Sequence, residues 1–191
     1  EKLIKRNGIN YKIDLNEGVD LGIFLNIKLE GKISNLMKLL GHTKKLNFID
    51  VGANIGSVTL PLAKIFDKSS IFSIEPTYYA YEKLLKNTNL NPILKKRIKT
   101  FNFLINNDKK TRKVYSSWNL NSKGKKHKIH LGSLKKINEK NIISLDQFIK
   151  KIKKKIFKSK RIKKLKKTHK KRKKIFKIKS LKTKKKKITK N

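Results

Sequence analysis

The sequence predicts an α/β fold: an incomplete Rossmann-like, doubly wound parallel sheet with three recognisable strands, an antiparallel lead-in, and a disordered or loosely helical basic tail. Two observations support this prediction. Short, continuously apolar runs, typical of strands buried on both faces of a parallel sheet, alternate with helical patterns over residues 46–105. The resulting strand–helix–strand–helix–strand order favours right-handed crossovers between parallel strands.

Residues 1–45 are expected to form the lead-in. Asn7-Gly8 lies between two short apolar runs, which indicates a β-hairpin. Apolar residues at positions 33, 36, 37 and 40 have the spacing of one helix face, and Gly41 follows as a typical helix end.

Residues 46–149 are expected to form half of the sheet domain. The predicted elements are, in order, a strand over 46–51, a turn over 52–57, a helix over 58–66, a strand over 70–74, a helix over 79–89 and a strand over 98–105. An antiparallel excursion with strands over 114–118 and 127–131 should follow, around a turn at 122–124. Residues 142–149 indicate a strand and then a helix start.

Residues 150–191 form a Lys-rich, low-complexity tail. The chain of 191 residues carries a net charge of +41, and this tail holds 25 of its 53 Lys and Arg residues but no acid. Two explanations of this charge remain open: selection for binding a polyanion, or the amino-acid bias of an A+T-rich coding sequence. A phosphate-binding surface should favour Arg, whose planar fork matches phosphate, whereas the chain has 48 Lys and 5 Arg, as an A+T-rich coding sequence would produce.

Composition also excludes several kinds of site. With no Cys, the chain has no disulfide, thiolate zinc site or cysteine nucleophile, and its four His residues lack metal-ligand spacing. We therefore expect no metal site. Charged residues interrupt the longest apolar stretch, so no transmembrane segment is predicted, and cytoplasmic localisation is expected.

The turn after the first parallel strand is the candidate site, because ligands of open parallel sheets lie beyond the carboxyl ends of the strands. Gly52 and Gly56 allow a ligand close to the backbone. Glu75 ends the next strand, where a carboxylate can accept hydrogen bonds from two ribose hydroxyls. The turn lacks the middle glycine of a dinucleotide fingerprint and the Gly-Lys-Ser/Thr of a P-loop. Asp50 before the turn suits an ammonium or sulfonium ligand.

Several segments together resemble the FkbM family of S-adenosylmethionine-dependent methyltransferases. They are FIDVGANIG at 48–56, IEP at 74–76, NLN at 89–91, RNG at 6–8, DLNEGVD at 14–20 and SLDQF at 144–148. The resemblance covers about residues 3–149. It implies transfer of a methyl group from S-adenosylmethionine, usually to a hydroxyl of a sugar or secondary metabolite, so the expected partner is a small-molecule or glycan hydroxyl acceptor.

The resemblance also implies cofactor-binding residues. The methionine part of the cofactor would lie against Asp50, Gly52, Ala53, Asn54 and Gly56, and Glu75 would hold the ribose. Asn106, Asn107 or Asp108 would meet the adenine. The competing interpretation is a tight turn and an ordinary strand-end carboxylate without a ligand, and Asn91 is expected to be a helix cap.

The resemblance ends in the C-terminal part. The family has an Ile-Lys-Ile-Asp type strand there, but this chain has no acid after Asp146. The strand over 46–51 should then have an open edge. A frameshift or truncation, a selected polybasic arm and a divergent folded half are three alternative origins of the tail. In the first case the chain would be an inactive methyltransferase. The alternative function is non-catalytic binding of nucleic acid or anionic membrane through residues 150–191.

Overall fold

The computed structural model describes residues 1–27, 30–41, 45–108, 110, 112–118 and 132–154. Internal contacts divide the chain into two units, Glu1–Ser144 and Leu145–Asn191. The first unit contains the parallel sheet and the candidate site. In the second unit, the structure describes a helix over 145–154.

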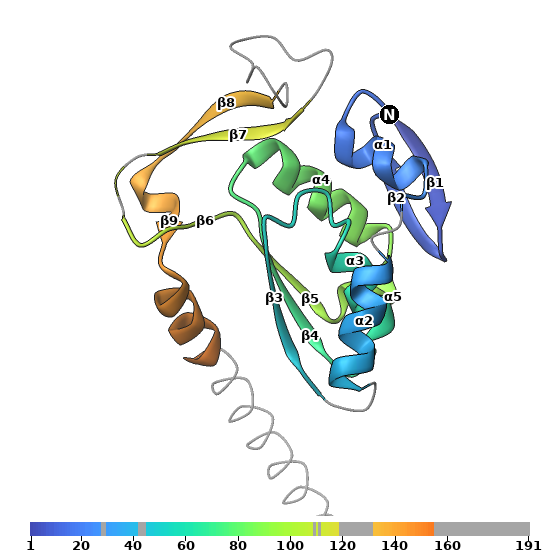
Figure 1. The fold of residues 1–191 in the computed structure, drawn as a ribbon. Coiled ribbons are helices and arrows are strands. Elements are labelled where there is room, and N and C mark those ends of the chain that lie inside the picture. The colour runs from blue at the N-terminus through green and yellow to red at the C-terminus, as the bar shows by residue number, and fades with distance from the viewer. Residues whose placement is uncertain (28–29, 42–44, 109, 111, 119–131, 155–191) are drawn as a thin grey trace, which may run out of the picture. The chain divides into compact units, whose positions relative to one another are not determined.

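The first unit is organised around a three-stranded parallel sheet (Figure 1). Strands β3 (Asn47–Val51), β4 (Ser70–Ile74) and β5 (Ile98–Phe101) lie side by side in that order. Helix α3 (Thr59–Ile65) connects the first pair, and helices α4 (Tyr78–Asn89) and α5 (Pro92–Lys95) connect the second. The predicted fold class is therefore confirmed.

The edges of this sheet have different surroundings. In the described part of the chain β3 pairs with β4 alone, and Val51 at its end is 55% exposed. Strand β4 lies between two neighbours, and its residues from Ile71 to Ile74 are all buried. The open edge expected for the first strand is thus present among the described residues.

The third strand is shorter than predicted. Strand β5 ends at Phe101, and the chain then forms β6 (Leu104–Ile105), which pairs in parallel with β9 (Ile142–Ile143) in a separate sheet. The Asn102 side chain lies at the break and donates to the carbonyl oxygens of Glu75 and Pro76 at 2.8 and 3.1 Å. An apolar run over 98–105 does not reveal this change of sheet.

The lead-in contains one more helix than predicted. The expected hairpin is present as β1 (Lys2–Arg6) and β2 (Ile9–Ile13), with Asn7 and Gly8 both at positive φ in the turn. Helix α2 (Glu30–Leu40) contains the predicted helix and ends before Gly41, also at positive φ. Helix α1 (Gly18–Phe24) was missed because two glycines weaken its helical pattern.

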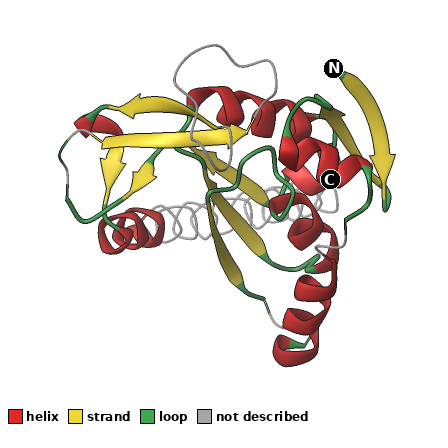
Figure 2. Ribbon diagram, turned by 45° about the horizontal axis from the view of Figure 1, so that its top comes forward, coloured by secondary structure: helices red, strands yellow, loops and turns green. Residues whose placement is uncertain are grey.

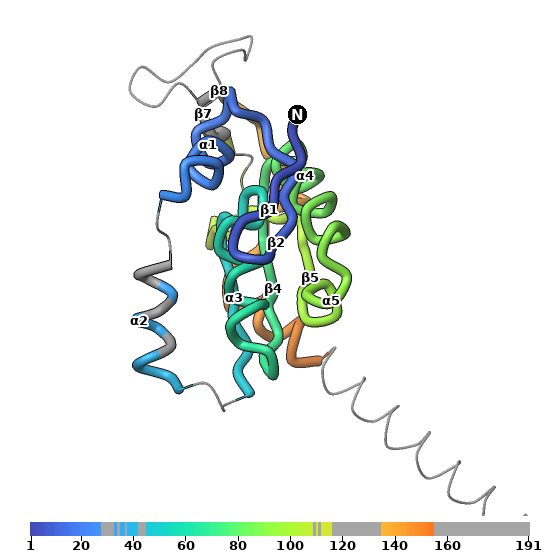
Figure 3. The backbone as a smooth tube through the Cα atoms, turned by 90° about the vertical axis from the view of Figure 1, so that its right-hand side faces the viewer, coloured from blue at the N-terminus to red at the C-terminus, as the bar shows by residue number. Residues whose placement is uncertain are grey.

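The hairpin is packed into the core of the first unit, next to α4 (Figure 3). Two buried asparagines of this region bond to β2. Asn87 accepts from the Lys12 amide at 2.7 Å and donates to the Ile55 carbonyl at 3.0 Å. Asn91 accepts from the Asn10 amide at 3.0 Å and donates to the Asn10 carbonyl at 2.8 Å. These side chains satisfy backbone groups that a lone hairpin would leave to water.

A two-stranded ribbon forms the remaining part of the first unit (Figure 2). Strand β7 (Arg112–Trp118) contains the predicted strand over 114–118 and pairs antiparallel with β8 (Gly132–Ile137). The predicted strand over 127–131 and the turn at 122–124 lie outside the described residues. The 3₁₀-helix η1 (Glu139–Asn141) leads from the ribbon to β9.

Most of the basic tail, residues 155–191, lies outside the described residues, so the expectations for it are untested. The start of the helix expected within 142–149 is present as the helix over 145–154. None of the helices that the structure describes combines the length and apolar character needed to cross a bilayer.

Replacing Asn87 should destabilise the protein strongly. Asn87→Ala leaves the Lys12 amide and the Ile55 carbonyl without their partner, and an unsatisfied buried polar group costs about 1–3 kcal/mol. Urea unfolding of Asn87→Ala should therefore show a loss of at least about 1 kcal/mol. The exposed neighbour Asn89 is the matched control, and Asn89→Ala should change the free energy of unfolding by less than about 0.5 kcal/mol. Equal losses would contradict the bridging role of Asn87.

Candidate functional site

The backbone bends sharply between β3 and α3. Gly52, Asn54 and Gly56 all have positive φ, at 79°, 49° and 96°. The amides of Gly52 and Ala53 both bond to the Ile74 carbonyl, at 2.8 and 3.0 Å. This pair of bonds holds the turn against the carboxyl end of β4, where the sequence predicted it.

Glu75 ties the turn to the next strand end. Its Oε2 accepts from the Asn54 amide at 2.9 Å, and its Oε1 accepts from the amide and hydroxyl of Thr77 at 2.9 and 2.6 Å. The side chain is buried. In the described part of the chain, these three are the hydrogen bonds that the Glu75 carboxylate accepts. Oε2 therefore keeps one lone pair for a ligand hydroxyl. Accepting two hydroxyls would require Thr77 to move.

Asp50 lies on β3, on the other side of the same turn. The Thr59 hydroxyl donates to its Oδ2 at 2.5 Å, and Thr59 Oγ1 lies 2.8 Å from Ser73 Oγ on β4. Because a hydroxyl carries one proton, Ser73 must supply the proton of the second contact. Burial raises the pKa of Asp50, the Thr59 hydrogen bond opposes this, and the negative charge of Glu75 adds to it.

The two glycines of the turn have different surroundings. A Cβ built on Gly52 would have no atom within 4 Å, whereas one on Gly56 would lie 3.1 Å from Leu84 and 3.3 Å from Leu60. Gly56 therefore permits close packing between the turn and two helices. Gly52 borders open space, as a backbone that admits a ligand should.

The structure brings some of the predicted residues together and leaves others apart. Asp50, Gly52, Ala53, Asn54, Gly56 and Glu75 all lie at the carboxyl ends of β3 and β4. Asn102, not residues 106–108, follows β5 directly. Asn106 comes after β6 and donates its amide to the Ile143 carbonyl, and Asp108 pairs with Arg112. Asn91 occupies the N-cap position of α5, as expected, but its side chain makes no cap bond and donates to the Asn10 and Asn87 carbonyls instead.

A buried ionic cluster near the start of α4 was not predicted. Lys83 pairs with Asp20, and its Nζ lies 3.5 Å from Glu17 Oε2. All three side chains are buried, and Asp20 Oδ1 has no hydrogen-bond partner in the described part of the chain. Lys83 also lies 5.6 Å from the ring centroid of Tyr79. From the sequence alone, a lysine of an amphipathic helix is expected on the solvent face. The pairing of Lys83 with Glu17 and Asp20 is therefore visible only in the structure.

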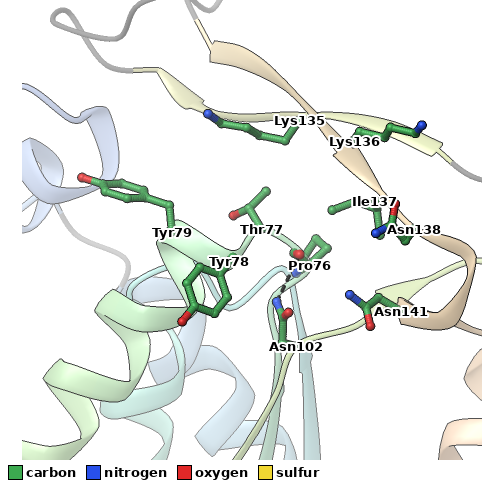
Figure 4. A pocket seen from close by; sticks show the side chains of 10 residues that line it. All are labelled: Pro76, Thr77, Tyr78, Tyr79, Asn102, Lys135, Lys136, Ile137, Asn138 and Asn141. Atoms are coloured by element: carbon green, nitrogen blue, oxygen red, sulfur yellow. Dashed lines mark hydrogen bonds between the residues drawn. The ribbon is translucent and has the colours of Figure 1, made fainter.

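A cavity of about 420 Å³ opens beyond the carboxyl ends of β4 and β5 (Figure 4). Pro76, Thr77 and the tyrosines 78 and 79 form one wall with Asn102. Residues 135–138 and Asn141, from β8 and η1, form the other. Thr77 belongs to both this wall and the Glu75 hydrogen-bond set, so the cavity adjoins the glycine turn.

The similarity of this chain to known proteins is limited to solved structures. No protein-family model and no curated protein matches the chain. Solved structures with partial similarity include TYW2 of P. horikoshii in complex with MeSAdo (26% identity, TM-score 0.37), TYW2 of M. jannaschii in complex with AdoMet (24%, 0.38) and the METTL16 MTase domain (24%, 0.37). These matches cover 53%, 53% and 50% of this chain, but only 35%, 42% and 36% of those chains.

The raised pKa of Asp50 predicts a pH-dependent effect of its replacement. A carboxyl with a raised folded-state pKa holds its proton longer in the folded chain than in the unfolded one, so its contribution to stability falls as pH rises through that window. Asp50→Asn removes this loss and keeps an oxygen for the Thr59 hydroxyl. The stability of Asp50→Asn relative to the parent should therefore rise between pH 4 and pH 7 in urea unfolding. Parallel pH profiles would contradict it.

The two glycines should differ in tolerance. Gly52→Ala meets only the cost of positive φ, about 1 kcal/mol. Gly56→Ala adds contacts with Leu84 and Leu60, for a total of about 2–4 kcal/mol. Thermal and urea unfolding of the two variants should therefore rank Gly52→Ala as the more stable, and the reverse order would refute the packing assigned to Gly56.

Proposed function

We propose that this chain is an S-adenosylmethionine-dependent methyltransferase of FkbM type, acting on a hydroxyl group. One observation carries the proposal: the glycine turn has open space before Gly52 and lies between two carboxylates, Asp50 and Glu75. A turn serving structure alone would need small residues where packing is tight, as at Gly56. Gly52 has a positive φ of 79°, which favours glycine in any tight turn, so it is the open space beside Gly52, and not the glycine itself, that supports a ligand here.

The proposed cofactor fits the chemistry of these residues. Asp50 offers negative charge to an ammonium or sulfonium group, and the remaining lone pair of Glu75 Oε2 suits a ribose hydroxyl. Gly52 supplies exposed backbone that a ligand can approach, and Ala53, Asn54 and Gly56 complete the turn that holds Gly52 in place. The resemblance at 48–56 and 74–76 supports the same assignment. When bound, the cofactor supplies an electrophilic methyl group.

The part of this chain in the reaction is mainly positioning. Buried hydrogen bonds fix the turn before any ligand arrives, and pre-organisation lowers the barrier of a displacement that needs an aligned nucleophile. A hydroxyl of a sugar or other small molecule or glycan is the proposed acceptor. We place the cofactor-binding half of the domain at residues 46–149, after a lead-in over 1–45.

The adenine end of the cofactor is proposed to lie toward Asn102 rather than residues 106–108. Asn102 follows β5 directly, and its side chain bonds to the carbonyls of Glu75 and Pro76. This places an amide beside the proposed ribose ligand. Asn106 lies beyond another strand, and Asp108 is engaged with Arg112.

Calorimetric titration with S-adenosylhomocysteine tests the proposed cofactor site. Gly52→Val fills the open space before the turn and should weaken binding at least about tenfold, equivalent to 1.4 kcal/mol. Gly41→Val is the matched control, because Gly41 also has a positive φ and a Cβ built on it also meets no atom within 4 Å. It should bind as the parent does.

A second variant tests the proposed ribose contact. Glu75→Ala removes both the proposed ligand contact and the bond to the Asn54 amide, so it should also lose binding. Circular dichroism checks that each variant is folded. If the parent, Gly52→Val and Glu75→Ala bind equally, or if none binds while all are folded, the proposed site is wrong.

A further inference from the structure

The β7–β8 ribbon, part of which lines the cavity, has an excess of positive charge. Residues 109–136 contain ten Lys and Arg residues and no acid. Of the described residues in this segment, Arg112 is paired with Asp108, whereas Lys113, Lys135 and Lys136 are exposed and have no ion-pair partner in the part that the structure describes. Glu139 is the nearest acid along the chain after the ribbon.

Exposed aromatic rings accompany these lysines. Tyr78 and Tyr79, at the start of α4, are 68% and 48% exposed, and both line the cavity. Figure 4 shows Lys135 and Lys136 along one wall of the cavity and the two tyrosines of α4 on the other. The hydroxyls of Tyr78 and Tyr79 bond to Glu82 and Glu17, which leaves the ring faces exposed. Burial of such rings is normally favourable, so exposed rings on one wall and lysines on the other indicate a ligand with flat apolar faces and negative charge.

We propose that the surface formed by Tyr78, Tyr79, Lys135 and Lys136, which all line the cavity, binds single-stranded nucleic acid. Phosphates would lie against the lysines, and unpaired bases would stack on the tyrosines, which is how strands are held without sequence preference. The cavity of about 420 Å³ has room for a nucleotide unit, and the amides of Asn138 and Asn141 offer hydrogen bonds to a base edge.

This surface differs from the basic tail as a candidate for nucleic-acid binding. Residues 150–191 contain only two aromatic residues, Phe157 and Phe176, among 25 Lys and Arg residues. The ribbon surface combines cations, rings and a cavity in one place. Binding of the strand does not depend on the function proposed above. Only a role of the bound strand as the methyl acceptor would depend on that function.

Fluorescence anisotropy with a labelled 12-nucleotide oligouridylate tests the lysines in the full chain. Lys135→Gln/Lys136→Gln should lower the slope of log affinity against log salt by about 1.4, because each lost contact to a single strand removes about 0.7. Lys95→Gln/Lys96→Gln removes the same charge from exposed positions on and after α5 and should leave the slope within about 0.3 of the parent. Equal slopes for the two double variants would overturn the proposal.

Replacement of Tyr78 tests the stacking. Tyr78→Ala should weaken binding of the oligouridylate at least about fivefold. Heparin, a polyanion without bases, should bind Tyr78→Ala as tightly as the parent, and so should a 12-base-pair duplex, whose bases are already stacked. If Tyr78→Ala weakens all three equally or none of them, the surface does not hold single strands.

The two proposals can fail independently. Lys135→Gln/Lys136→Gln should bind S-adenosylhomocysteine as the parent does, and Gly52→Val should retain the oligouridylate. Loss of strand binding with intact cofactor binding in the double variant supports the ribbon surface. A parent that binds the strand but no S-adenosylhomocysteine would leave the ribbon proposal standing and remove the proposed function.

Discussion

The turn between β3 and α3 depends on hydrogen bonds from side chains, because its backbone leaves the ladder of the sheet before the helix begins. Glu75 accepts from the Asn54 amide, the Asn54 side chain accepts from the Ile55 amide, and Asn87 donates to the Ile55 carbonyl. Glu75 follows β4 directly, and Asn87 lies within α4. Side chains from two neighbouring elements therefore hold a few backbone atoms of the candidate site.

Charge is distributed unevenly through this arrangement. The buried carboxylates of Glu17 and Asp20 share one buried lysine, whereas Asp50 accepts hydrogen bonds from the hydroxyl and the backbone of Thr59. Burial raises the pKa of both Asp20 and Asp50, so neither ionises as readily as in water. The unpaired lysines of the ribbon lie on the opposite wall of the cavity from the start of α4. The same unit thus presents acidic groups at the glycine turn and basic groups on the ribbon.

Local patterns predicted the parallel strands and the glycine turn because their determinants are contiguous. The run over 70–74 matches β4, and the helix over 79–89 differs from α4 by one residue. Features that depend on distant contacts were not predictable. The break at Asn102 follows from bonds to Glu75 and Pro76, and the burial of Lys83 follows from two acids some 60 residues away. Helix α1 was not predicted because its glycines lower its helix propensity, a loss that its packing against the core compensates.

The double role of Asn87 limits which amino acids position 87 can accept. Its oxygen must accept and its nitrogen must donate, within one short planar group. Aspartate of the same shape lacks the donor, leucine lacks both functions, and glutamine places the amide one methylene further out. The lead-in and the glycine turn are therefore coupled through Asn87. A substitution that shifts the hairpin against α4 would change the hydrogen bond to the Ile55 carbonyl even if no residue of the turn had changed.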